Sequence, residues 1–361
     1  MPEFKNILIV ANSGRMLAQL SRNAGLVPLV IDCFSDFDTQ SLALDCVKVN
    51  TLELKYVRKA LSVLSHHNRI SHVIYGSGLE RYNSTIKFLY QNLVVLGNTQ
   101  DVFSLIQNKT YFFSRLKYLG ILFPDITFQV PDINDNWLVK PKQGEGGVGI
   151  KKYAGLSEIT AACYWQKFIT GKTMSVLFVA NGNEYKIIGF NKQYFTRIAD
   201  NQFVFSGVIS QPEINKEIVQ TIKLWLAALI PDFALKGINT LDFIVKNNCC
   251  YVLEVNARPS ASMQLYQQDL LTRHINSLID AQLQSFIVIK TYKAYKIVFA
   301  ETEVFINDHI QWPLWVVDIP RSGSIIHTGT PICSIIADGK NEPQINSLLL
   351  NRQQYLKKLL Q

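Results

Sequence analysis

Residues 253–259, Leu-Glu-Val-Asn-Ala-Arg-Pro, place a carboxylate, an amide and a guanidinium at alternate positions of one short apolar segment. Successive side chains of a β-strand point to opposite faces, so Glu254, Asn256 and Arg258 share a face if this segment is a strand. Carboxylate and amide oxygens are ligands that Mg²⁺ prefers, and a guanidinium beside them suits a phosphorylated anion. The segment therefore predicts a strand that contributes to a cation and phosphate site.

A second apolar segment, one turn upstream, carries Asp242, and residues 246–249 between the two segments form a turn in a predicted hairpin. A two-residue turn would place Asp242 opposite Leu253 and send Glu254 to the far face. A three-residue turn or a β-bulge would place Asp242 opposite Glu254. A metal site made of Asp242, Glu254 and Asn256 therefore predicts an odd turn or a bulge. A half-exposed hairpin with ordinary surface acids is the alternative.

The composition indicates a globular protein with large cores. The chain has 361 residues, 48% of them hydrophobic, which is enough for two or three domains. No apolar run approaches the roughly 18–20 residues of a membrane span, and the first residues do not have the layout of a signal peptide. None of the six cysteines forms a Cys-x-x-Cys pair, which predicts reduced thiols, a cytoplasmic location and no structural zinc.

The formal net charge is +8, and the lysines and arginines are scattered along the chain. A basic surface of this kind suits small anions such as nucleotides. No known RNA- or DNA-binding motif is present. We therefore expect small-molecule partners and neither a nucleic acid nor a membrane.

The chain divides by pattern into three parts, residues 1–98, 99–172 and 173–361. In the first part strands alternate with helices, which favours a small, mostly parallel sheet covered on both faces. Two turns that follow its strands, residues 11–15 and 76–80, are candidates for the substrate side, although a plain strand-to-helix turn is the alternative at the first. Beyond residue 126 strands are longer, with one helix near 213–229 and an amphipathic helix at 346–361.

A glycine-rich loop joins two strand-like segments in the second part of the chain. It contains four glycines that let the backbone approach phosphates closely: Gly144, Gly146, Gly147 and Gly149. It is not a Walker A loop, because Gly-Lys-Ser/Thr is absent and no helix follows. Lys140 precedes the loop, and Lys109 lies upstream, so that two ammonium groups could reach the same phosphates. A flexible hairpin lid without a ligand is the alternative.

With these residues in this order, the chain resembles the ATP-grasp superfamily over nearly its whole length. The resemblance implies a fold of the α/β and α+β classes: an N-terminal Rossmann-like pre-grasp domain, a small lid domain, and a larger antiparallel-sheet domain with a C-terminal β extension. It also implies that Lys109 and Lys140 hold the phosphates of ATP under a glycine-rich lid, and that Asp242, Glu254 and Asn256 bind Mg²⁺, with Mn²⁺ as an alternative ion.

The segment at residues 165–171 matches the adenine-binding hinge of that superfamily, which implies base contacts from the backbone of Gln166, Lys167, Phe168 and Ile169. Two positions depart from the superfamily pattern, because Gln166 replaces the common glutamate and Met174 replaces a second one. The ribose contacts are therefore open, with Glu184 or a water as substitutes. Gln193 either lines the site or is a strand-surface amide.

A closer similarity is to a group described as predicted ATP-dependent carboligases related to biotin carboxylase. Five segments carry it: 13–19, 174–179, 312–315, 318–323 and 329–334. Members of that group occur alongside tetrahydromethanopterin-linked one-carbon metabolism. The similarity implies a role in making a pterin- or furan-type C1 cofactor, and dimers are common among similar proteins.

The expected activity is that of a carboxylate–amine ligase that acts through an acyl phosphate and releases ADP. In it, Lys140 neutralises charge on the phosphates and Arg258 holds the anionic intermediate. The alternatives are a carboxylase that uses carboxyphosphate and a nucleotide-binding assembly or regulatory protein without turnover. Trp312 and Trp315 either form a wall for a flat substrate or belong to a core cluster, and we expect Cys333 to be a buried, inert thiol.

Overall fold

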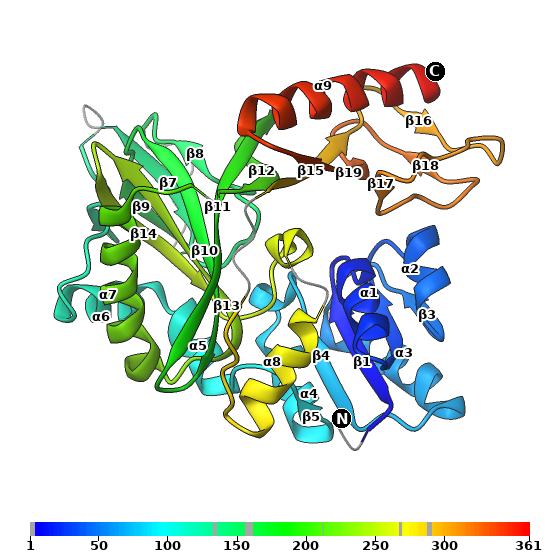
Figure 1. The fold of residues 1–361 in the computed structure, drawn as a ribbon, viewed down its shortest axis with the longest axis horizontal. Coiled ribbons are helices and arrows are strands. Elements are labelled where there is room, and N and C mark those ends of the chain that lie inside the picture. The colour runs from blue at the N-terminus through cyan, green and yellow to red at the C-terminus, as the bar shows by residue number, and fades with distance from the viewer. Residues whose placement is uncertain (1–3, 133–135, 156–161, 212, 267–268, 287–290) are drawn as a thin grey trace.

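The computed structural model describes residues 4–132, 136–155, 162–211, 213–266, 269–286 and 291–361. Figure 1 shows an N-terminal lobe, a large antiparallel sheet beside it, and a C-terminal segment that ends in a long helix above the N-terminal lobe. Among the described residues, no helix has both the length and the apolar character needed to cross a lipid bilayer.

The N-terminal lobe is built on a five-stranded parallel sheet in the order β3-β2-β1-β4-β5. Residues Ile7 to Ala11 of the central strand are completely buried, as expected for a strand covered on both faces. Helix α1 packs on one face, and α3 and α4 pack on the other. The elements are β1 (Asn6–Ala11), α1 (Arg15–Asn23), β2 (Val27–Asp32), α2 (Phe37–Leu42), β3 (Asp45–Lys48), α3 (Leu54–His67), β4 (His72–Tyr75), the 3₁₀ helix η1 (Leu79–Arg81), α4 (Asn83–Asn92) and β5 (Val94–Val95).

A smaller antiparallel sheet follows, in the order β6-β9-β7-β8, and the glycine-rich loop connects β7 to β8. Helices α5 and α6 precede this sheet but share an apolar cluster with helix α7 of the large sheet. The elements are α5 (Gln100–Gln107), α6 (Lys109–Tyr118), β6 (Ile126–Thr127), β7 (Trp137–Pro141), β8 (Lys151–Lys152) and β9 (Cys163–Lys167).

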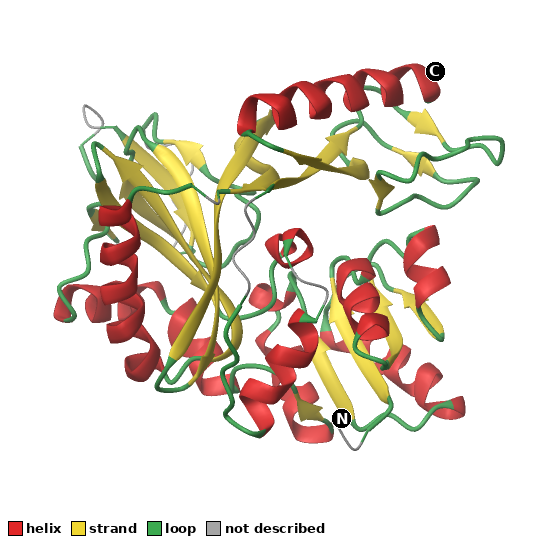
Figure 2. Ribbon diagram, in the orientation of Figure 1, coloured by secondary structure: helices red, strands yellow, loops and turns green. Residues whose placement is uncertain are grey.

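The large sheet has eight antiparallel strands in the order β14-β13-β10-β11-β12-β15-β19-β17. Figure 2 shows its long strands in yellow, with helices beside them in red. Helix α7 covers one face, and α8 packs between the other face and the N-terminal lobe. The elements are β10 (Lys172–Asn181), β11 (Tyr185–Ile198), β12 (Asn201–Ser210), α7 (Lys216–Phe233), β13 (Lys236–Lys246), β14 (Cys249–Asn256), η3 (Ala261–Leu265), α8 (Leu270–Ile279), β15 (Tyr292–Phe299), β16 (Val304–Phe305), β17 (Val316–Val317), β18 (Ile325–Ile326), β19 (Pro331–Gly339) and α9 (Glu342–Leu359).

Candidate functional site

The hairpin of β13 and β14 has the bulge that the metal hypothesis requires. The turn contains two residues, Asn247 and Asn248, whose φ angles of 51° and 64° suit a hairpin of type I′. Phe243 pairs with Val252, and the register then shifts so that Asp242 pairs with Glu254. Because Leu253 is the extra residue of a β-bulge, both acids reach the same part of the sheet surface.

Asp242 lies on the face of the sheet that is turned away from helix α7, since its neighbours Leu241 and Phe243 pack in the cluster that includes that helix. Its carboxylate accepts hydrogen bonds from Nε2 of Gln193 and Nδ2 of Asn256, both at 3.0 Å. Gln193 therefore lines the site. Burial and, after it, the adjacent charge of Glu254 raise the pKa of Asp242 to about 7, against the opposing hydrogen bond from Gln193.

Two of the three predicted metal ligands, Asp242 and Glu254, are placed to bind a hard cation. The carboxylates of Asp242 and Glu254 are adjacent, and a cation between them would relieve the repulsion that raises the pKa of Asp242. Among the described residues there is no group of three or more His, Cys, Asp or Glu side chains placed to hold a metal ion. The third ligand would therefore be the amide oxygen of Asn256, which accepts from Nη2 of Arg258 at 3.4 Å and would have to turn.

The two predicted phosphate-binding lysines both reach this region. Nζ of Lys109, at the start of α6, lies 3.9 Å from Oε2 of Glu254. Nζ of Lys140, on β7, donates to Oε1 of Gln166 on the neighbouring strand β9 at 2.7 Å. Burial lowers the pKa of Lys140 to about 8, with Glu254 acting against this and Lys109 adding to it. The site therefore contains an ammonium, that of Lys140, which titrates near neutral pH and whose charged form can bind anionic phosphates.

The glycine-rich loop lies against strand β12 of the large sheet. The carbonyl of Gly146 accepts from the N–H of Phe205 at 2.8 Å, and the N–H of Gly149 donates to Oδ1 of Asn201 at 3.0 Å. At Gly147 the φ angle is +74°, and a side chain would overlap the carbonyl oxygen of Phe203. Only glycine allows this close approach of two backbones, so the loop is seen in a closed position.

The hinge between β9 and β10 has two N–H groups that are already used. Lys167 donates to the carbonyl of Asp125 at 2.8 Å and Phe168 to that of Asn136 at 2.7 Å. A base edge would therefore have to pair with the N–H of Ile169 and with backbone carbonyls of the hinge. The ring of Phe168 lies 6.2 Å from that of Phe203, centroid to centroid, beside the loop.

Glu184, one of the two substitutes for a ribose contact, does not lie in a suitable place. Glu184 lies in the turn after Asn181, at the opposite end of β10 from the hinge, so the expectation that it binds ribose is wrong. Met174 is buried in the apolar cluster that includes helix α7 and does not face the phosphate side.

Arg258 links the metal hairpin to the N-terminal lobe. Its Nε donates to Oε1 of Glu80, and its Nη1 donates to the carbonyl of Pro259 at 3.2 Å. Glu80 comes from the predicted substrate-side turn at residues 76–80, and both side chains are less than a tenth exposed. Burial alone would raise the pKa of Glu80, but the charge of Arg258 and the hydrogen bonds that the carboxylate accepts outweigh it and keep this pKa below its usual range. Arg258 is thus a fixed cation that faces Asn256 on one side and Glu80 on the other.

The turn at residues 11–15 is not an anion site. The N–H of Gly14 donates to Oδ2 of Asp32 at 3.0 Å, and Nε of Arg15 donates to Oδ1 of Asp318 at 2.9 Å. Arg15 also donates to Oε1 of Gln264 at 2.7 Å. This turn therefore connects the N-terminal lobe to the C-terminal segment, a role that the sequence did not indicate.

The tryptophans of the C-terminal segment belong to its core. Trp312 and Trp315 pack in the apolar cluster of β15, β19 and α9, and Trp315 stacks edge-on to Tyr355 at 5.8 Å. This packing favours the core cluster over a substrate wall. Cys333 is buried in the same cluster, and burial raises the pKa of its thiol, as expected for an inert residue.

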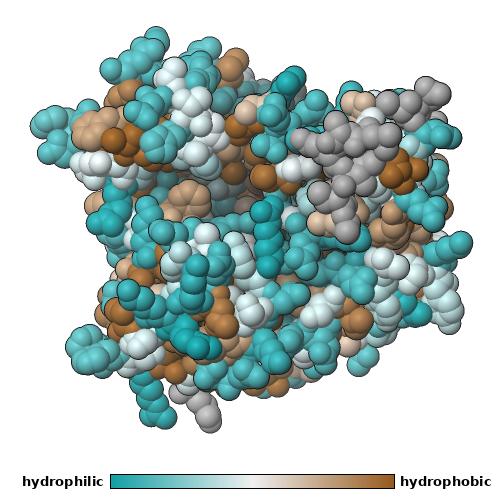
Figure 3. All heavy atoms as spheres, turned by 180° about the vertical axis from the view of Figure 1, so that it is seen from behind, coloured by the Kyte–Doolittle hydropathy of each residue, from teal (hydrophilic) through white to brown (hydrophobic). Residues whose placement is uncertain are grey.

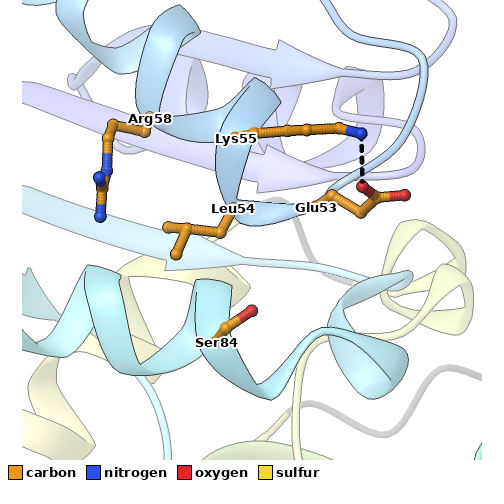
Figure 4. A pocket seen from close by; sticks show the side chains of 5 residues that line it. All are labelled: Glu53, Leu54, Lys55, Arg58 and Ser84. Carbon is orange, nitrogen blue, oxygen red and sulfur yellow. Dashed lines mark ion pairs between the residues drawn. The ribbon is translucent and has the colours of Figure 1, made fainter.

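A pocket in the N-terminal lobe lies apart from the site at the hairpin. Figure 3 shows the back of the molecule hollowed between its upper and lower lobes. A separate, open pocket of about 350 Å³ lies between α3 and α4 and is lined by Glu53, Leu54, Lys55, Arg58 and Ser84 (Figure 4). Its one ion pair, Lys55 with Glu53 at 3.2 Å, is exposed. None of its residues belongs to the site at the hairpin.

Comparisons with known proteins agree with this geometry. Residues 106–262 match a family described as the ATP-grasp domain. A relative in Methanocaldococcus jannaschii, an uncharacterized protein, is 26% identical over 282 residues, which are 73% of this chain and 69% of the relative.

Two solved structures resemble nearly the whole chain. Biotin carboxylase from Campylobacter jejuni has a TM-score of 0.74 and 15% identity, and the alignment covers 97% of this chain and 91% of that one. L-amino acid ligase from Bacillus licheniformis has a TM-score of 0.71 and 13% identity, with 97% of each chain covered. The chain therefore contains an ATP-grasp domain and has the ATP-grasp fold, as the resemblance implied.

Proposed function

We propose that this chain is an ATP- and Mg²⁺-dependent ligase that joins a small carboxylate to a small amine through an acyl phosphate and releases ADP. The observation that carries the proposal is the bulge that sets Asp242 opposite Glu254, with Lys109 3.9 Å from the second acid. A buried acid beside a second, half-buried acid is costly unless a cation compensates the two charges. Enzymes of the same fold, among them the L-amino acid ligase, support the reaction class.

The residues of the site have separate roles in this proposal. Lys109 and Lys140 bind phosphate oxygens, and the loop at Gly144–Gly149 closes over them and excludes water. Mg²⁺, or Mn²⁺ in its place, would be held by Asp242, Glu254 and Asn256 and would neutralise charge on the phosphates. The hinge at 166–169 binds the base.

The chemistry then proceeds in two balanced steps. An oxygen of the substrate carboxylate forms a bond to the γ-phosphorus of ATP, and ADP leaves with the electrons of the broken P–O bond. The amine nitrogen then forms a bond to the acyl carbon while the C–O bond to phosphate breaks. The departing phosphate takes the proton that the nitrogen loses. Arg258 stabilises the anionic acyl phosphate between these steps.

The substrate class is proposed from the resemblance of five segments to the carboligase group. On that basis the acid or the amine is a precursor of a pterin- or furan-type C1 cofactor, and the enzyme works in the cytoplasm as a monomer or a homodimer.

A carboxylase that uses bicarbonate through carboxyphosphate is the second candidate, because the fold also resembles biotin carboxylase with a TM-score of 0.74. A nucleotide-binding protein without turnover is the third. Product analysis separates the three: an amide with ADP, a carboxylated product with ADP, or ATP binding without ADP.

The test is ADP release from Mg·ATP with mixtures of carboxylates and amines, followed by mass analysis of the product. We expect release that requires both an acid and an amine, and a loss of roughly 10²–10³-fold in Glu254→Ala. The matched control is Glu184→Ala, which removes an acid at the remote end of β10. Turnover that survives in Glu254→Ala would refute the proposed mechanism.

A further inference from the structure

Glu145 of the glycine-rich loop reaches across to the N-terminal lobe. Its Oε1 accepts a hydrogen bond from Nδ2 of Asn12, the residue that follows strand β1. The same loop is bonded to β12 of the large sheet through Gly146 and Gly149. When the loop is closed, it therefore touches both walls of the site, and Glu145 is its contact with the wall that carries the substrate-side turn.

The second oxygen of Glu145 is in an unusual position. Oε2 is buried and has no hydrogen-bond partner among the described residues. Glu145 also lies near Glu80, whose charge acts on the carboxyl group of Glu145. Glu80 is the residue that binds Nε of Arg258, and Nη2 of Arg258 faces Oδ1 of Asn256. Hydrogen bonds thus run from Glu80, next to the loop residue Glu145, through Arg258 to the metal hairpin.

We propose that Glu145 is a positioning residue that docks between Asn12 and Glu80 when the glycine-rich loop closes and so fixes Arg258 for the acyl-transfer step. The role of Arg258 in this inference rests on the proposed function. The docking itself rests only on the contacts of Glu145 and on the closed position of the loop. Closure over the phosphates and organisation of the acceptor side would then be one event.

The charges around Glu145 indicate how the docking depends on pH. Burial and the adjacent Glu80 raise the pKa of Glu145 to about 7, against the opposing charges of Arg258 and Arg81. The protonated carboxyl can donate a hydrogen bond to Glu80, whereas the carboxylate repels it. Docking should therefore take up a proton and should be firmer at pH 6 than at pH 8.

Hydrogen exchange of the loop at 144–149 in saturating Mg·ATP tests the docking directly. We expect Glu145→Ala to lose at least tenfold protection while its Kd for Mg·ATP stays within about threefold of the wild-type value. Glu145→Gln keeps an acceptor for Asn12 and gains a donor for Glu80. Its loop should therefore stay protected from exchange, and the protection should be the same at pH 6 and at pH 8. Gln143→Ala, an exposed position in the same loop, is the control and should match the wild type.

Wild-type protection in Glu145→Ala would overturn the inference while leaving the proposed function intact. Once an acid and an amine that support turnover are found, Glu145→Ala should lower kcat at least tenfold with KM for ATP nearly unchanged, as expected for a residue that acts through Arg258. Absence of Mg·ATP binding by the wild type would instead overturn the proposed function and this role with it.

Discussion

Gln166 and Lys140 form a hydrogen bond of 2.7 Å across two neighbouring strands of the small sheet. Lys140 pairs with Tyr164 in the strand register, so Gln166, two residues further on, is its diagonal neighbour on the same face. Glutamine at this hinge position departs from the superfamily pattern. Because the side chain of Gln166 is a neutral amide, it orients the ammonium of Lys140 without cancelling its charge.

The first prediction concerns Gln166→Glu. A carboxylate at this position would raise the pKa of Lys140 from about 8 toward its ordinary value of about 10.4. If Lys140 binds phosphate as an ammonium, wild-type affinity for Mg·ATP should fall as the pH rises through about 8. In Gln166→Glu that fall should move to a higher pH. Titration calorimetry between pH 7 and pH 9.5 measures both curves.

Gln143→Glu is the matched control, because it adds the same charge at an exposed position of the adjoining loop. Its binding curve should follow the wild type. Identical curves for the wild type and Gln166→Glu would show that Lys140 does not bind the phosphates as an ammonium.

A second prediction concerns Glu254→Gln. Without ligand, the free energy of unfolding should change little, because the substitution relieves the repulsion of Asp242 but also removes the counter-charge that lies 3.9 Å from Nζ of Lys109. With Mg·ATP at ~100 times its Kd, the wild type should gain roughly 2.7 kcal/mol of unfolding free energy, and the variant should gain much less. Thermal unfolding with and without Mg·ATP measures both effects, with Glu184→Gln as the control. An equal gain in wild type and variant would exclude Glu254 from the site.

The part of the site that could be predicted from sequence lies within short segments. Alternation along 253–259 predicted a shared face, and the need for Asp242 to meet Glu254 predicted the bulge that is present. Both follow from the period of a strand, which is a local property. Most elements of the N-terminal lobe were predictable for the same reason, although α2 and β3 were missed.

Contacts between distant segments were not predictable in this way. Glu80 and Arg258 are 178 residues apart, and Arg15 and Asp318 are 303 apart. No periodicity relates such pairs, because the packing of whole lobes brings them together. The same reason explains why Glu184 was wrongly considered for ribose: its distance from the hinge depends on the length of β10.

The third prediction concerns the connection between the N-terminal lobe and the C-terminal segment. Arg15 is buried and is bonded to Asp318 and Gln264. Removing one member of a buried ion pair leaves the other charge uncompensated. Arg15→Leu should therefore lower the unfolding free energy by about 3–5 kcal/mol in chemical denaturation. Lys55→Leu, which breaks the exposed pair with Glu53, should leave the midpoint nearly unchanged.

His274 carries the fourth prediction, which concerns pH. Its buried ring accepts from the N–H of Ile238 at 2.8 Å and donates to the carbonyl of Leu96 at 3.1 Å, and burial lowers its pKa to about 4. The unfolded chain, with a pKa of about 6.5, binds a proton that the folded protein does not between these values. The stability from His274 is therefore present above about pH 6.5 and is lost as the pH falls toward 4.

Buried carboxyl groups with raised pKa values have the opposite effect on stability, because they bind protons in the folded protein and so favour folding at lower pH. Asp32 and Asp36 are examples, with pKa values raised by burial to about 6 and about 8. The informative quantity is thus the difference in unfolding free energy between wild type and His274→Gln. It should shrink as the pH falls from 7 to 4.5. His309→Gln, at an exposed position, should show no such trend, and a constant difference for His274→Gln would contradict the assigned cause.

The last prediction separates two neighbouring glycines of the closed loop. Gly146 and Gly147 both have positive φ angles, 60° and 74°, so alanine should cost about 1 kcal/mol of backbone strain at either position. A side chain at Gly146 meets nothing within 4 Å, whereas one at Gly147 would overlap the carbonyl oxygen of Phe203. Gly147→Ala should therefore prevent the loop from lying against β12, and Gly146→Ala should not. Hydrogen exchange in Mg·ATP should show a protected loop in Gly146→Ala and an unprotected loop in Gly147→Ala. Equal protection in the two variants would mean that the loop does not close onto β12 in solution.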